Sequence, residues 1–134
     1  MEHTNVKILA ISDVPSKALW DYDTRARLEG IDLILSCGDL PKKYLEYLTN
    51  FTTVPILYVH GNHDGSYRGD EPGGCICVDD QVYVWKGLRI MGLGGCQRYN
   101  KEDTYQYNDL NQMVSKHVCG YEQKITRIYD YGYT

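Results

Sequence analysis

Three apolar segments in the first half of the chain each end in a polar turn. They cover residues 6–12, 33–37 and 55–60, and each has the length and composition of a buried strand. Between them, apolar residues at helical spacing predict helices over residues 16–28 and 42–48. Strands and helices that alternate through short connections are typical of a parallel sheet with crossover helices. The pattern therefore predicts an α/β fold.

The boundaries of the two helices follow from the residues beside them. Ser16 is suited to cap the first helix and Gly30 to end it, while Pro41 is suited to the first turn of the second helix. The apolar side of that second helix is expected to consist of Tyr44, Leu45 and Leu48.

After residue 64 the pattern becomes less regular. Residues 65–74 are rich in glycine and charge and predict a surface loop, and residues 81–86 and 88–93 predict a hairpin that turns at Lys86-Gly87. A last helix is expected to begin at Asn108, before a tyrosine-rich tail over residues 120–134. We expect an uncovered apolar face and an open edge on the hairpin, through which the chain would self-associate. The apolar residues concerned are Val82, Val84, Ile90 and Leu93.

Composition and charge narrow the functional classes. The net charge of −4 comes from both signs mixed along 134 residues, which argues against a general nucleic-acid or membrane-surface binder. The N-terminus lacks the pattern of a signal peptide, and no apolar run approaches the roughly 20 residues of a membrane span. An odd count of five cysteines without a regular frame is usual for a reducing compartment, so we expect a cytoplasmic protein.

Each predicted strand is followed by a polar group that can bind a metal. Asp13 follows the first strand, Gly38-Asp39 the second and Gly61-Asn62-His63-Asp64 the third. In an open α/β sheet, ligands bind outside the carboxyl ends of the strands. Carboxylate, amide and imidazole donors suit Mn²⁺, Fe, Zn²⁺ or Mg²⁺ better than a soft metal.

In this order, and each after an apolar strand, these turns resemble those of the calcineurin-like metallophosphoesterase family. The resemblance implies an αββα sandwich and a phosphoric ester hydrolase with two divalent metal ions. Such an enzyme, a phosphatase or a phosphodiesterase, attacks a phosphomonoester or phosphodiester with a metal-bound hydroxide. By resemblance, Asp13 binds the first metal, Asn62 binds the second and Asp39 bridges them. His63 would stabilise the phosphate and protonate the leaving oxygen, and Asp64 would support the turn.

The chain departs from the family pattern at two places. The family's first turn is normally Asp-x-His, whereas this chain has Asp13-Val14-Pro15, and His117 is the one histidine after His63. We therefore expect residues 1–119 to form a metallophosphoesterase-like domain that is incomplete on its C-terminal side. The alternative to an enzyme is a non-catalytic binding module of this fold, or an inactive fragment of such an enzyme. A receiver-like or flavodoxin-like domain with an acidic pocket is a third interpretation.

Every candidate residue also has a purely structural interpretation. Asp39 and Asp13 could each cap the helix that follows, and Asn62 could hold a left-handed turn. His63 could be a surface turn residue and His60 a packing residue at a strand end. For the cysteines we favour small hydrophobic residues over a zinc site, because their spacing matches no known zinc motif. The zinc alternative would take Cys75 and Cys77 with Cys96 and Cys119, and Cys37 is expected inside a buried strand.

Overall fold

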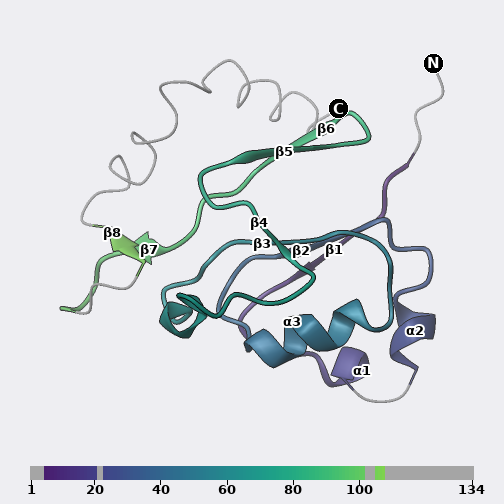
Figure 1. The fold of residues 1–134 in the computed structure, drawn as a ribbon, viewed down its shortest axis with the longest axis horizontal. Helices are drawn as coiled ribbons and strands as arrows, with labels where there is room; N and C mark the ends of the chain where they lie inside the picture. The colour runs from purple at the N-terminus through teal and green to yellow at the C-terminus, as the bar shows by residue number, and fades with distance from the viewer. Residues whose placement is uncertain (1–4, 21–22, 102–104, 108–134) are drawn as a thin grey trace.

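A four-stranded parallel sheet forms the centre of the molecule. The computed structural model describes residues 5–20, 23–101 and 105–107. The strands follow one another across the sheet in chain order, as β1 (Ile8–Ile11), β2 (Leu33–Ser36), β3 (Ile56–Tyr58) and β4 (Ile76–Cys77) (Figure 1). The three predicted strands and the α/β class are confirmed. The short strand β4 lies directly after the predicted loop and was not predicted as a separate element.

The first crossover contains two short helices, so the prediction of one helix over residues 16–28 was wrong. Helix α1 (Lys17–Trp20) and helix α2 (Thr24–Arg27) are separated by a break. Asp23, which precedes α2, has a left-handed backbone with φ of 63°, and a helix cannot continue through that conformation. The buried Thr24 hydroxyl donates a hydrogen bond of 3.2 Å to the Leu19 carbonyl, which holds α2 against the end of α1.

Helix α3 (Lys42–Thr49) packs its predicted apolar side on one face of the sheet. Pro41 precedes the first helical residue rather than lying within the first turn, and its carbonyl accepts the Tyr44 amide at 3.0 Å. Figure 1 shows α1, α2 and α3 together on this side of the sheet. The buried residues that α3 contributes to the core are Tyr44, Leu45 and Leu48.

The predicted hairpin is present and covers the other face of the sheet (Figure 1). Strands β5 (Val82–Trp85) and β6 (Leu88–Met91) are antiparallel, and Lys86 and Gly87 both have positive φ, as a two-residue hairpin turn requires. Tyr83 and Ile90 pair across the hairpin and pack against the cluster of Leu33, Leu57 and Val78. Ile90 is therefore covered, contrary to expectation, whereas Val84 is 62% exposed.

The remaining described segments lie close to the carboxyl ends of the strands. The predicted loop over residues 65–74 is less of a surface loop than expected, because it contains the 3₁₀ helix η1 (Gly65–Tyr67) and buries Tyr67. Strand β7 (Cys96–Gln97) pairs in parallel with β8 (Gln106–Tyr107). The predicted helix from Asn108 and the tail over residues 120–134 lie outside the described residues. Among the described helices, none is long and apolar enough to cross a membrane.

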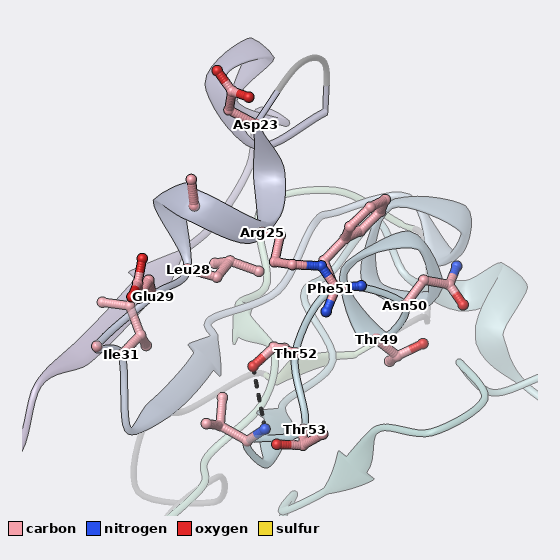
Figure 2. Close-up of a pocket in the computed structure, with 13 residues that line it drawn as sticks. Asp23, Arg25, Leu28, Glu29, Ile31, Thr49, Asn50, Phe51, Thr52 and Thr53 are labelled. Carbon is pink, nitrogen blue, oxygen red and sulfur yellow. Dashed lines mark hydrogen bonds between the residues drawn. The ribbon is translucent and has the colours of Figure 1, made fainter.

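A hollow of about 770 Å³ lies at the opposite, amino end of the strands. It is lined by residues 23–31, which lead into β2, and by residues 49–54, which lead into β3 (Figure 2). Within it the Thr52 hydroxyl accepts the Val54 amide at 3.2 Å. The hollow is remote from the polar turns at the carboxyl ends and contributes no residue to them.

The sheet core gives a first testable prediction. Ile56→Val should lower the free energy of unfolding by about 1 kcal/mol, because Ile56 is 1% exposed and the lost methyl leaves a small cavity. The same substitution at Ile76, which is 39% exposed on β4, is the matched control and should change it by less than about 0.5 kcal/mol. Urea denaturation measures both, and equal effects would mean that the two sites are packed alike.

Candidate functional site

The polar turns after β1, β2 and β3 come together at the carboxyl ends of the strands. The Asp13 amide donates to the Gly38 carbonyl at 3.1 Å, and the His63 amide donates to Asp39 Oδ1 at 2.8 Å. A Cβ placed on Gly38 would lie 2.7 Å from the Gly61 nitrogen, so the second and third turns touch. Each turn is thus hydrogen-bonded to the next, as the strand-end rule predicts.

Two of the candidate ligands have an unusual backbone. Asp13 and Asp39 have φ of 65° and 61°, in the left-handed region that residues other than glycine seldom adopt. Such conformations cost free energy and occur often at functional sites. The alternative that Asp39 caps helix α3 is wrong, because Pro41 holds the capping position and the Asp39 carboxylate accepts the His63 amide instead.

Asp64 joins the second turn to the third through its buried carboxylate. Its buried Oδ2 accepts the amides of Asp39 and Gly61, each at 2.8 Å. Burial raises the pKa of the Asp64 carboxyl, and the two backbone hydrogen bonds only partly counteract that effect. Through the hydrogen bond from the Asp39 amide, Asp64 holds the Asp39 backbone in position.

Asn62 and His63 lie at the accessible side of the same turn. The Asn62 side-chain amide lies 3.3 Å from His63 Nε2 and donates to the Tyr99 hydroxyl at 2.9 Å. His63 is exposed, and Tyr99 is 64% exposed. Tyr99 was missed by the sequence interpretation, since it follows the hairpin by several residues and nothing local links it to the third turn.

The residue types on the three turns are ones that bind divalent metal ions. Asp13 and Asp39 supply hard carboxylate oxygens, and Asn62 can add an amide oxygen. Gly61 leaves the space that this arrangement needs, because a Cβ there would lie 2.1 Å from Asp39 Oδ1. Pro15, two residues after Asp13, has a side chain that offers no ligand atom.

His60 was expected to be a packing residue but is also the centre of a partly buried polar network. Its Nδ1 contacts Asp79 Oδ2, and its Nε2 lies 2.9 Å from Glu71 Oε2. Burial alone would lower the pKa of His60, but the hydrogen bonds to Asp79 and Glu71 outweigh it and raise the pKa. The sequence interpretation named neither Glu71 nor Asp79. Both lie in later segments, outside the third turn, that only the fold brings next to His60.

The cysteines differ in their surroundings. Cys37 is exposed just after β2, so its assignment to the buried part of a strand was wrong. Cys75 packs against the helix-side core as expected, and Cys77 both packs there and lies 3.9 Å from His60 Nδ1.

The rate of alkylation should differ between Cys37 and Cys75. Burial raises the pKa of the Cys75 thiol to about 11, so only about one thiol in a thousand is ionised at pH 8. Iodoacetamide should modify Cys37 readily at pH 8 and Cys75 only as the pH approaches 11, as mapped by mass spectrometry of the folded chain. Equal rates at pH 8 would show that Cys75 is accessible and ionised.

Comparison with known proteins agrees with the arrangement of the three turns. The family model described as calcineurin-like phosphoesterase matches residues 6–128, which is most of the chain and includes all three turns. Neither the curated proteins nor the solved structures include a match to this chain. With a match of this extent, the chain belongs to the calcineurin-like phosphoesterase family.

Proposed function

We propose that this protein is a metal-dependent phosphoesterase acting on a phosphomonoester or phosphodiester. The observation that carries the proposal is the position of Asp39. Its carboxylate lies where the second and third turns meet, within 2.8 Å of the His63 amide, and its neighbour Gly38 accepts the amide of Asp13. A carboxylate at such a junction is the residue type that two cations can share.

Different residues are proposed to bind the metal ions and to position the ligands. Asp13, Asp39 and Asn62 are the proposed metal ligands, on three neighbouring turns. Bound divalent ions would neutralise the phosphate oxygens and lower the pKa of the attacking water. Asp64 keeps Asp39 in its left-handed conformation through the Asp39 amide, so the carboxylate is held in place before any ion arrives.

His63 is the proposed acid for the leaving group. His63 is exposed, whereas its backbone amide is held by the Asp39 carboxylate. An imidazole there can hydrogen-bond a phosphate oxygen and deliver a proton to the departing alcohol. The Asn62 side chain, 3.3 Å from His63 Nε2, limits the positions that the ring can take.

One observation favours a second candidate, a non-catalytic module of the same fold. Pro15 stands where the family's first turn normally carries a histidine, so the first ion would lose an imidazole ligand. Loss of a ligand or of its supporting partner costs tenfold to a hundredfold in metal affinity or activity. We therefore expect weak metal binding and slow turnover.

Calorimetric titration with Mn²⁺ and assays of chromogenic phosphomonoesters and phosphodiesters test both candidates on the full chain. Weak binding together with slow hydrolysis that requires Mn²⁺ would support the enzyme. Metal binding without hydrolysis of either ester would favour the binding module. Tight binding of two ions with rapid turnover would mean that the ligand lost at Pro15 is replaced from elsewhere in the chain.

A further inference from the structure

A second group of ligand-type side chains lies at the ends of β3 and β4. His60, Cys77 and Asp79 each offer one donor atom, and all three atoms lie within 4.8 Å of one another. His60 Nδ1 lies 3.9 Å from Cys77 Sγ and also contacts Asp79 Oδ2. In a tetrahedral zinc site, bonds of about 2.0–2.3 Å place ligand atoms about 3.3–3.8 Å apart. The separation of Nδ1 and Sγ is close to that value, whereas Asp79 Oδ2 must move away from Nδ1 to admit an ion.

The orientation of His60 supports a role as a ligand. Nδ1 faces Cys77 and Asp79, whereas Nε2 lies 2.9 and 3.0 Å from the two carboxylate oxygens of Glu71. Histidines that bind a metal commonly donate their second ring N–H to a carboxylate, which fixes the tautomer and the ring. The Tyr58 hydroxyl donates to Glu71 Oε2 at 2.7 Å, so this carboxylate is itself held in place.

The surroundings of the cluster hold it in one arrangement. The ring of Tyr105 stacks on His60 with centroids 4.6 Å apart, and Tyr67 meets the His60 ring edge to face. Asp79 Oδ1 accepts the His60 amide at 3.1 Å, and the His60 carbonyl accepts the Gly95 amide at 2.7 Å. A site whose donors are fixed by packing and backbone contacts loses little entropy when an ion binds.

We propose that His60 Nδ1, Cys77 Sγ and Asp79 Oδ2 form a mononuclear site for a borderline divalent cation, best suited to Zn²⁺. A set of one nitrogen, one sulfur and one oxygen is unsuited to Mg²⁺ or Ca²⁺, which take oxygen ligands. Three protein ligands leave the fourth tetrahedral position to water. The ion displaces the thiol proton of Cys77 and any proton on His60 Nδ1, and both are released to solvent.

The proposed site shares no residue with the candidate centre formed by Asp13, Asp39, Asn62 and His63. Its expected role is structural, because the ion joins β4 to the residue that precedes the turn of Gly61 to Asp64. The inference does not depend on the proposed phosphoesterase function. The competing explanation is a metal-free network in which a protonated His60 pairs with Asp79 and Glu71.

Titration of the reduced full chain with Co²⁺ tests the site by absorption spectroscopy, because thiolate ligation gives an intense charge-transfer band that oxygen and nitrogen ligands do not give. We expect the band in the wild type and its loss in Cys77→Ser. Cys75→Ser is the matched control and should retain the band, since Cys75 belongs to the helix-side core. Absence of the band in the folded wild type, or its persistence in Cys77→Ser, would overturn the proposal.

Three further variants keep the test decisive. If Cys77→Ser does not fold, a variant that keeps Cys77 and replaces the other four cysteines by serine must retain the band, and loss of it counts against the site. Asp39→Asn removes the proposed shared ligand of the other centre. After dialysis against Zn²⁺, elemental analysis of this variant should still find one zinc per chain, and none when His60→Gln is added. Zinc retained after that addition would place the ion elsewhere and overturn the assignment.

Discussion

Asp39→Asn is expected to lower both the Mn²⁺ affinity and the metal-dependent hydrolysis rate by about a hundredfold or more. Asparagine keeps an oxygen that can accept the His63 amide, which Asp39 Oδ1 accepts at 2.8 Å, so the turn should persist. The neutral amide cannot offset the charge of two cations, and that loss is the reason for the effect. Calorimetry and kcat/KM for a chromogenic ester measure it.

Asp32→Asn is the matched control for this prediction. Asp32 lies at the opposite end of the same strand, just before β2, and its carboxylate accepts the Lys7 amide at 2.8 Å. Asp32→Asn should leave metal affinity and turnover unchanged, because Asp32 is remote from the three turns. If Asp39→Asn binds Mn²⁺ as the wild type does, Asp39 is not a metal ligand and the phosphoesterase proposal loses its main support.

The parts of the fold that could be predicted from sequence depend on local patterns. The segments over residues 33–37 and 55–60 are continuous apolar runs, which suit strands covered on both faces. Because parallel strands end at one edge of the sheet, the polar residues that follow them could be placed together without coordinates. The hairpin turn at Lys86-Gly87 depended on an equally local signal, because glycine readily adopts the positive φ that a two-residue hairpin turn requires.

The features that were missed depend on contacts between distant segments. The break between α1 and α2 requires Asp23 to adopt a left-handed conformation, which helical spacing of apolar residues does not reveal. Glu71 and Asp79 reach His60 across 11 and 19 positions of sequence, and Tyr99 reaches Asn62 across 37. One signal was available for the His60 network, because a histidine at the end of a buried strand needs polar partners.

Gly61→Ala is expected to destabilise the protein by about 3 kcal/mol and to abolish metal binding at the candidate centre. The added Cβ would lie 2.1 Å from Asp39 Oδ1 and 2.6 Å from the Asp39 nitrogen. The side chain alone cannot relieve this clash, because the second contact is with backbone that Asp64 Oδ2 holds at 2.8 Å. The second and third turns must therefore separate, which moves Asp39 away from Asn62.

Gly73→Ala provides the comparison for a glycine with room for a side chain. The nearest atom to an added Cβ there is Glu46 Oε1 at 3.5 Å, an ordinary contact with a flexible side chain. Urea denaturation should show a change of less than about 0.5 kcal/mol for Gly73→Ala, and calorimetry should show unchanged Mn²⁺ binding. Normal stability and normal metal binding in Gly61→Ala would mean that the two turns need not touch, and the geometry argued for the candidate centre would be wrong.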